Sequence, residues 1–377
     1  MKPLDIVIRS LLVIYFQAFA FSSAICQDQR SSSDKVSLLF IGDIMGHDGQ
    51  IIAAEDALNH TYNYNDVFRY IKPLISETDF AIANLEVTLA GPPYRGYPRF
   101  SSPDELAVAC RDAGIDCFVT ANNHLADRGK TGIISTIRKL DSIGLQHTGT
   151  FCSSECHDTL SPLIINCKGA SIALLSYTYG TNGIDISEHG IVNMLDKDII
   201  AEDIVKAKEA KVDIIILYLH WGTEYDTIPG KDQIEFTNWL FLSGVDMVIG
   251  SHPHVLQKMA WTKDADTGKG RIVAYSLGNF VSNQRKPGTD GGSIIRIDLL
   301  KNGDSYDISD AGYYLTWVYI HVENNKKRYY ILPCSKFEED AGFFTNPEDY
   351  DMMKKFINDS RKFLKRQNIN MKEYLIN

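Results

Sequence analysis

Short apolar runs alternate with helical patterns through most of the chain, and this alternation constrains the fold more than any other feature. It is typical of α/β proteins, in which helices cover a layered sheet. Pro103 is expected to open a helix with Ser102 as its cap, and Gly114, Gly144 and Gly244 are expected to end helices. The expected strands are residues 36–41, 80–83, 117–120, 172–176, 214–219, 245–249 and 272–275, and the expected helices are residues 66–76, 103–113, 131–143, 197–211 and 231–243.

The pattern changes after residue 290. Residues 293–299, 313–322 and 328–332 have the character of strands, and residues 348–366 form an amphipathic helical pattern. We therefore expect a main domain over residues 36–290 and a β-rich and helical C-terminal extension, residues 291–377, packed on the same domain. A chain of 377 residues with 44% hydrophobic residues can build a core of this size.

The first residues have the three-part layout of a secretory signal. Lys2 and Arg9 precede an apolar stretch, residues 11–21, and small residues follow it at positions 22–24. We expect a signal peptide over residues 1–26, a polar linker over residues 27–35, and an exported protein that is periplasmic or on the cell surface. The apolar stretch is shorter than the span of about 20 residues that crosses a membrane easily, but an uncleaved membrane anchor remains the alternative.

Charge and cysteine content narrow the partners and the compartment. The formal net charge is −10, and the sequence has no basic stripe, so we do not expect the protein to bind nucleic acid. In an oxidising compartment Cys152 and Cys156 flank a short loop and could pair, whereas Cys110 and Cys117 are expected to be buried thiols. The sequence has no CxxC pair, so a structural zinc knuckle is not expected.

Polar side chains that can bind metals follow five of the expected strands. The motifs are GDIMGH with Asp43 and His47, ANLEVT with Asn84 and Glu86, ANNHLADRG with Asn122, Asn123, His124 and Asp127, LHWGTEY with His220 and Glu224, and GSHPH with His252 and His254. Open α/β sheets bind ligands at the carboxyl ends of their strands. We therefore expect these loops to meet at one rim.

Each residue taken alone also has an ordinary structural explanation. Asp43 could cap a turn, Glu86 could pair with an arginine, and Asn122 and Asn123 could hold a turn through bonds to the backbone. His220 could be a core histidine beside its tryptophan neighbour. The joint pattern favours a metal site, because successive strand ends carry mainly Asp, Glu, Asn and His.

A bound cation would explain why such groups gather. Carboxylates and imidazoles crowded at one rim repel each other or lose hydration, and a divalent cation removes both penalties. The mixed oxygen and nitrogen donors suit manganese, iron or zinc better than calcium. We expect one or two such ions, which together can activate a water molecule and stabilise an oxyanion, as in hydrolases.

The order of these motifs is similar to that of the calcineurin-like metallophosphoesterase superfamily. More narrowly, FIGDIM, ANLEVTL, ANNHLADRG, LHWGTEY, GSHPHVLQ and YSLGNF resemble the motifs of the capsule synthesis protein CapA family, which is linked to poly-γ-glutamate capsule formation and envelope assembly. The resemblance spans residues 38–281. It implies an α/β, layered metallophosphatase-like (metallo-dependent phosphatase) αββα fold.

The resemblance also implies roles for single residues. His124 would be the proton donor or would stabilise the transition state, and Asp127 could orient it, with helix-start capping as the alternative for Asp127. Glu86 would bridge two metal positions. The implied ligand set is Asp43 and His254 at the first metal, and Asn123, His220 and His252 at the second.

The sequence departs from the superfamily pattern at one metal position. Metallophosphoesterases usually have a histidine two residues after the first aspartate, and here that residue is Met45. Glu86 stands where an aspartate is more usual. His47 is a possible substitute ligand, but the first metal is expected to be weakly held or absent.

One long loop and three further polar residues are candidate contacts for a substrate. The long loop AGPPYRGYPRFSSP carries Arg95 and Arg99, and we expect it to contact an anionic envelope polymer, either polyglutamate or a glycan. Asn84, Glu224 and Asn279 are further candidate substrate contacts, although a Gly-Asn turn also explains Asn279.

Three functions follow from these expectations. The first is a metal-dependent hydrolase or transferase of capsule or cell-envelope polymer synthesis. The second is a non-enzymatic polymer-binding assembly factor for a membrane synthase complex, which the missing histidine favours. The third is a secreted metallophosphatase or nucleotidase.

Overall fold

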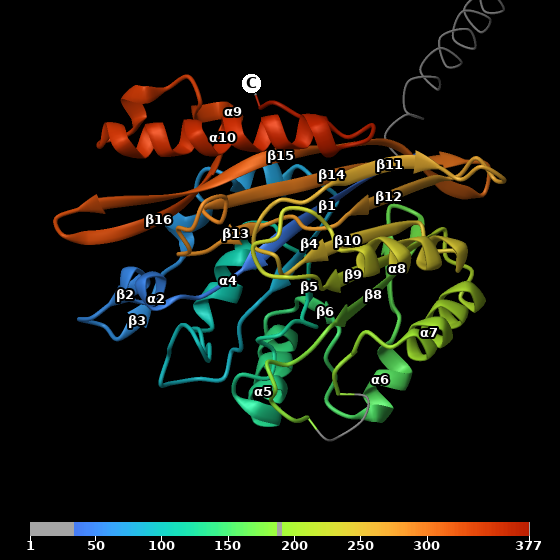
Figure 1. Cartoon of the computed structure of the whole chain (residues 1–377). Coiled ribbons are helices and arrows are strands. Elements are labelled where there is room, and N and C mark those ends of the chain that lie inside the picture. Colours follow the sequence, from blue (N-terminus) through green and yellow to red (C-terminus); the bar gives the residue numbers. More distant parts are fainter. Residues whose placement is uncertain (1–33, 187–190, 377) are drawn as a thin grey trace, which may run out of the picture.

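The computed structural model describes residues 34–186 and 191–376 (Figure 1). The expected signal peptide and nearly all of the expected linker lie outside these residues. Within the described ranges, none of the helices has the length and apolar character needed to cross a membrane.

Two mixed β-sheets form the centre of the molecule. The first has the order β16-β15-β14-β1-β4-β5-β6, with β13 beside β1 and β17 beside β15. The second has the order β11-β12-β10-β9-β8-β7, and β2 and β3 form a separate small ribbon. The strands are β1 Lys35–Ile44, β2 Glu55–Asp56, β3 Thr61–Tyr62, β4 Phe80–Leu85, β5 Cys117–Val119, β6 Gln146–Thr148, β7 Leu163–Cys167, β8 Ala170–Thr178, β9 Ile214–His220, β10 Met247–Ser251, β11 Met259–Lys263, β12 Gly270–Ala274, β13 Asn279–Val281, β14 Gly291–Asn302, β15 Ser305–Glu323, β16 Lys326–Pro333 and β17 Lys372–Glu373.

The helices lie mainly outside the two sheets, and Figure 1 shows α10 running along β15 on one side of the molecule. They are α2 Asp48–Ala54, α3 Lys72–Ser76, α4 Glu105–Asp112, α5 Gly129–Ser142, α6 Ser154–Leu160, α7 Lys197–Glu209, α8 Lys231–Leu242, α9 Cys334–Phe337 and α10 Pro347–Gln367, with short 3₁₀ helices η1 Asn65–Phe68 and η2 Ala341–Phe343.

The apolar side chains divide into layers that follow from strand periodicity. Alternate residues of a strand point to opposite faces. In β1, Leu38 and Phe40 enter the core between the two sheets, whereas Leu39 and Ile41 enter a second core with η1, α3 and α4. The far face of the second sheet packs on α7 and α8. The order helix, sheet, sheet, helix is the αββα architecture expected above.

Parallel pairing places five strand ends at one edge. The strands β1, β4 and β5 run parallel in the first sheet, and β9 and β10 run parallel in the second. Near this edge, the hydroxyl of Tyr218 in β9 donates a 2.8 Å hydrogen bond to the carbonyl of Ile41 in β1. The carboxyl ends of the two sheets therefore meet.

Two local expectations were wrong. Residues 66–76 do not form one helix but split into η1 and α3, because Pro73 occupies the first turn of α3 and cannot donate the backbone bond that a continuous helix needs. Pro103 does not open the next helix and Ser102 does not cap it: α4 begins at Glu105 after Asp104, and Ser102 Oγ has no hydrogen-bond partner in the part of the chain that is described.

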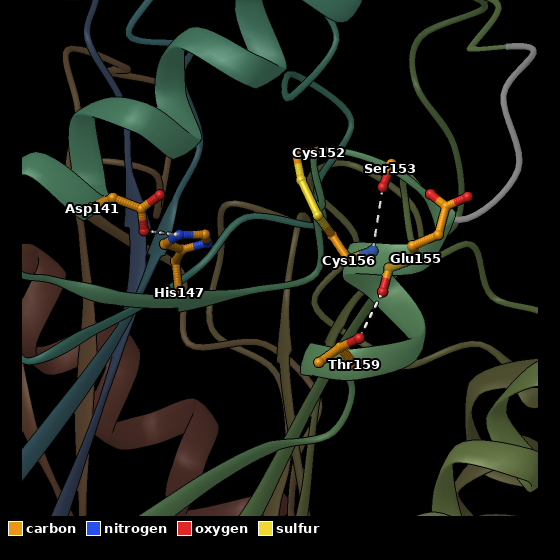
Figure 2. Close-up of a disulfide and its surroundings, with 7 residues drawn as sticks. All are labelled: Asp141, His147, Cys152, Ser153, Glu155, Cys156 and Thr159. Atoms are coloured by element: carbon orange, nitrogen blue, oxygen red, sulfur yellow. Dashed lines mark hydrogen bonds and ion pairs between the residues drawn. A yellow bond between two sulfur atoms is a disulfide. The ribbon is translucent and has the colours of Figure 1, made fainter.

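The cysteines behave as expected from their spacing. Cys152 and Cys156 form a disulfide at the start of α6, where Ser153 Oγ accepts a hydrogen bond from the Cys156 amide (Figure 2). Cys110 and Cys117 are buried free thiols. The disulfide closes a short loop and fixes the beginning of α6.

The C-terminal residues continue the first sheet. The strand β14 begins at Gly291 and pairs antiparallel with β1 over Lys35–Ile41, and β15 and β16 extend the sheet outward. The expected terminal helix is α10, which packs on β15. Arg361 of α10 pairs with Glu338, just after α9, and with Glu373 of β17, so this segment is also held by charge.

Candidate metal centre

Two buried groups of three side chains lie where the strand ends meet. Glu86, His220 and His252 offer donor atoms that all lie within 4.8 Å of one another, and so do Asp43, Glu86 and His254. The residues come from the ends of β1, β4, β9 and β10 or the loops that follow them. Glu86 belongs to both groups. These five, with Asn123, are the six side chains for which the sequence predicts metal binding.

Glu86 is the least expected group to find in a protein interior. Its side chain is completely buried, and within the described part of the chain neither carboxylate oxygen receives a hydrogen bond. Oε1 lies 3.5 Å from His220 Nε2 and 3.8 Å from His254 Nε2, and no arginine pairs with it among the described residues. Burial, followed by the negative charge of Asp43, raises the pKa of Glu86 well above its ordinary value.

The imidazoles of His220 and His252 are held neutral. Burial lowers the pKa of His220 well below its ordinary value and lowers that of His252 to about 3. The two ring centroids lie 4.8 Å apart, and His252 Nδ1 has no hydrogen-bond partner among the described residues. A neutral imidazole is the form that binds metal ions.

Neighbouring polar groups orient His220. Asn123 Oδ1 lies 2.9 Å from His220 Nε2, and Ser251 Oγ lies 2.9 Å from Nδ1. Asn123 is itself buried and donates from Nδ2 to Asn182 Oδ1. The Asn123 oxygen and the His220 nitrogen therefore face the same space as Glu86.

Asp43 and His254 are joined directly. Two oxygen atoms flank His254 Nδ1, Asp43 Oδ2 at 3.0 Å and Asn279 Oδ1 at 3.1 Å, so this nitrogen donates and Nε2 is left facing Glu86. Asn84 donates from Nδ2 to Asp43 Oδ1 at 2.8 Å. Asn84 is fully buried, and this bond positions the Asp43 carboxylate.

The loop GSHPH has an unusual backbone. His252 has a φ of 101° and His254 a φ of 59°, on either side of Pro253. Residues other than glycine in this region cost about 1–3 kcal/mol each and persist where the surroundings enforce them. In this backbone conformation both histidines have a ring nitrogen within 4.8 Å of a Glu86 carboxylate oxygen.

These residues fit a divalent cation. The Glu86 carboxylate receives no hydrogen bond within the described residues, and His252 Nδ1 has no partner there, so a positive charge between them would stabilise both groups. A bound cation would supply that charge and hold Glu86 in its ionised form. Because the donors are a mixture of oxygen and nitrogen, the set suits a transition metal or zinc.

His124 and Asp127 form a second polar pair beside this centre. His124 Nδ1 lies 2.8 Å from Asp127 Oδ2, which also accepts a 2.7 Å hydrogen bond from the Phe100 amide. Asp127 does not cap α5, whose first residue follows Arg128 without a side-chain cap. Its geometry is that of a residue orienting His124, and the ring of Phe100 packs edge-on against the same imidazole at 4.7 Å.

A pocket of about 340 Å³ opens beside His124. Its lining includes Asn123, His124 and Asp127, together with Arg99 and Glu224. Arg95 does not line this pocket, because its backbone pairs with Ser101 and its side chain is exposed elsewhere on the loop. Of the two arginines expected to contact substrate, only Arg99 therefore lies at this pocket. The pocket is called the His124 pocket.

Three residues predicted from sequence lie in structural positions. Asn122 holds its turn by accepting from the His124 amide and donating to the Leu85 carbonyl, as its ordinary explanation requires. Asn279 donates both amide bonds within the protein, to Gln284 and Thr289. His47 belongs to neither of the two metal-competent groups found in the described ranges; its Nδ1 accepts from the Asn283 amide, and burial lowers its pKa to about 4.

Met45 is buried in an apolar core. It is 2% exposed and packs in the core formed with η1, α3 and α4. The position where a second imidazole is usual in metallophosphoesterases therefore contributes no donor here. The group formed by Asp43, Glu86 and His254 has correspondingly fewer ligands.

Two further residues at the centre are not among those predicted from the sequence. Tyr179 follows β8, and its ring centroid lies 4.6 Å from that of His252. Ser251 is the last residue of β10 and contacts His220. Both stand at strand ends, so the rule that identified the other residues would have found them had hydroxyl side chains been included.

Most of the chain has counterparts in known proteins. Residues 37–284 match the model of the family described as bacterial capsule synthesis protein PGA_cap. The capsule biosynthesis protein CapA of Bacillus anthracis is 27% identical over 295 residues, covering 75% of this chain and 68% of the relative. The PGA biosynthesis protein CapA of Bacillus subtilis (strain 168) is 27% identical over 287 residues, covering 72% and 70%.

A solved structure with a similar chain trace is the NAD nucleotidase NadN of Haemophilus influenzae. It has a TM-score of 0.46 and 14% sequence identity, covering 89% of this chain and 64% of that chain.

Proposed function

Because the chain belongs to the bacterial capsule synthesis protein PGA_cap family, we propose that it acts in the synthesis of an anionic capsule or cell-envelope polymer of the polyglutamate type, as a metal-dependent hydrolase or transferase. The printed names of the two Bacillus relatives, one in capsule and one in PGA biosynthesis, support the polymer. The buried donor groups support the metal.

The metal would be held by residues of both groups. Asp43, Glu86 and His254 would form one position, and Glu86, His220, His252 and Asn123 the other. Manganese, iron or zinc bound there would polarise an acyl or phosphoryl group and lower the pKa of a water molecule.

The remaining chemistry belongs to the chain. Asp127 holds the proton of His124 on Nδ1, so that Nε2 can accept a proton from, or return it to, a group bound in the His124 pocket. Arg99 lines the same pocket and supplies a positive charge for an anionic chain. The buried carboxylate and imidazoles exclude bulk water from the opposite end of the site.

The observation that carries this proposal is the environment of Glu86. A completely buried carboxylate that receives no hydrogen bond within the described residues, yet lies near two imidazoles, has an electrostatic explanation if a cation binds between them. A purely structural carboxylate would be expected to pair with an arginine or with backbone amides.

Elemental analysis combined with a turnover assay tests the proposal. Residues 28–377 are purified, loaded with manganese, iron or zinc, and assayed for cleavage or transfer of γ-linked oligoglutamate. We expect bound metal and turnover, both lost in His252→Ala and retained in the control His147→Ala, whose imidazole pairs with Asp141 away from the centre. A parent protein that binds no metal under any loading condition would refute the proposal.

A second candidate is a non-enzymatic assembly factor that binds the polymer for a membrane synthase. The observation that favours it is Met45, which leaves one metal position with three residues. Bound polymer and bound metal without turnover would favour this function. Turnover of a generic phosphoester would instead favour a secreted metallophosphatase or nucleotidase.

The proposed place of action follows from the polymer. We infer that residues 1–26 direct export and that the protein works in the periplasm or at the cell surface, either released or held by an uncleaved anchor. Cell fractionation of the full chain beside a chain lacking residues 1–26 tests this. Equal export of both chains would contradict it.

A further inference from the structure

A second pocket lies on the side of Tyr179 and Trp221. It has a volume of about 470 Å³ and is lined by residues that follow β8 and β9 and by residues of α7 and α8. Tyr179 lines it and packs on His252, whose ring lies beside that of His220. His220 Nε2 in turn faces Asn123 of the His124 pocket. Tyr179 therefore lies between this space and the histidines of the metal centre. We call the space the Tyr179 pocket.

An unpartnered buried amide lies in the Tyr179 pocket. Gln233 is 4% exposed, and its Oε1 accepts a 2.9 Å hydrogen bond from the Gly230 amide. Its Nε2 has no partner in the described part of the chain. Gly222, with a φ of +88°, also lines the pocket, and a Cβ at that position would lie 2.8 Å from this Nε2. The absence of a side chain at Gly222 thus allows the Gln233 amide to pack against it and to line the pocket with an unpaired donor.

The rim of the Tyr179 pocket carries both signs of charge. Lys197, Asp226 and Asp232 line the pocket with exposed side chains, and none of them forms an ion pair within residues 34–186 and 191–376. The Lys197 ammonium lies over the rings of Phe236 and Trp239, with 5.7 and 5.5 Å to their centroids. These contacts hold the cation in place and leave its charge uncompensated by a carboxylate.

The aromatic walls do not favour a stacked sugar. Trp221 is 3% exposed and stacks on Tyr275 with 5.9 Å between ring centroids, while Phe236 meets it edge to face. The broad face of Trp221 is therefore covered by another ring. A neutral sugar would also leave the three rim charges without partners. A ligand that carries a positive and a negative group close together would satisfy all three.

We propose that the Tyr179 pocket binds an α-amino-acid headgroup, in which an ammonium and a carboxylate sit on one carbon. Asp226 and Asp232 face the ammonium, Lys197 the carboxylate, and Gln233 Nε2 a carboxylate or carbonyl oxygen. The inference rests on the proposed function and sharpens it. In a γ-linked polyglutamate chain only the amino-terminal residue carries both groups, so the pocket selects that end of the polymer.

Equilibrium binding of two matched probes tests this assignment. The probes are γ-linked triglutamate with a free amino terminus and the same peptide N-acetylated, titrated by calorimetry into the protein as purified and after chelation. We expect the free peptide to bind at least tenfold more tightly than the acetylated one in both preparations. This experiment measures binding and needs no turnover, so it tests the pocket assignment independently of catalysis. The proposed function fails by a different result, namely that the parent protein takes up no metal.

Charge variants identify the pocket. Asp226→Asn with Asp232→Asn should remove the preference for the free amino terminus, and Lys197→Met should weaken both peptides by at least tenfold. The matched control is Lys231→Met, a lysine that pairs with Glu235 outside the lining. Equal affinity for the two peptides, no binding at millimolar concentration, or tighter binding of N-acetylglucosamine that ignores the charge variants would each overturn the proposal.

Discussion

His124 Nδ1 lies 2.8 Å from Asp127 Oδ2, and both side chains are buried at the edge of the His124 pocket. The same carboxylate oxygen accepts from the Phe100 amide, so Asp127 is fixed before it meets the imidazole. A carboxylate held in this way sets which ring nitrogen carries the proton. The pair links the loop that carries Arg99 to the metal centre.

Replacing Asp127 by asparagine should reduce turnover without removing metal. The amide can no longer stabilise the charged imidazole or hold its proton on Nδ1, and we expect a loss of about 10–100-fold in kcat. Steady-state kinetics and elemental analysis of the same sample measure both quantities. The matched control is Asp141→Asn, which disturbs the exposed pair with His147 shown in Figure 2. An Asp127 variant with unchanged kcat would remove the orienting role.

Introducing the imidazole that metallophosphoesterases usually have at the position of Met45 should not repair the first metal position. Met45 packs in an apolar core, so Met45→His would bury a polar ring at a cost of about 1–3 kcal/mol. Chemical denaturation should show lower stability, and elemental analysis should show no additional metal. A stable variant with one more bound ion would show that the side chain can turn toward Asp43.

The two loop arginines should differ in their effect on polymer binding. Arg99 lines the His124 pocket and Arg95 does not, so Arg99→Ala should weaken binding of an anionic oligomer several-fold while Arg95→Ala serves as the charge-matched control. Titration at two salt concentrations measures the effect, which should shrink as salt rises because exposed charges are screened. Equal losses in both variants would indicate a diffuse charge effect instead.

The C-terminal segment should lose stability in acid through Glu338. Both carboxylate oxygens of Glu338 accept hydrogen bonds from Arg361, and this pairing lowers the pKa of Glu338 below its ordinary value. The pair therefore adds to the free energy of unfolding above the unfolded-state pKa of Glu338. This stabilisation is lost as the pH falls through the lower folded-state pKa. Glu338→Gln should cost about 1 kcal/mol at pH 7 and much less at pH 3.5, measured by denaturant unfolding. Glu339→Gln, at an exposed carboxylate, is the control. A cost independent of pH would contradict this origin.

Much of the fold could be predicted because buried strands consist of continuous apolar runs that can be recognised in the sequence. Each strand expected before residue 290 overlaps an observed one, since parallel strands covered on both faces leave little room for polar residues. The short strand β6 and the edge strands β7 and β11 were missed, because they have polar or exposed residues. The break between η1 and α3 was signalled by Pro73 and overlooked.

The sequence could predict which residues form the candidate site, but not how they are arranged in space. Strand-end position identified Asp43, Glu86 and His220, because the rule depends only on where an apolar run stops. The sequence could not show that two separate sheets supply the ligands, which here depends on contacts such as Tyr218 with Ile41. Nor could it separate Arg99 from Arg95, because their difference arises from how one loop folds.

Anomalous diffraction from crystals soaked in manganese would locate a metal ion bound by the buried carboxylates and imidazoles. We expect a peak within bonding distance of Glu86, His220 and His252, and a loss of that peak in the isosteric variant Glu86→Gln. A structure in which Glu86 is instead protonated and hydrogen-bonded to protein or water, with no peak at either buried group, would contradict it.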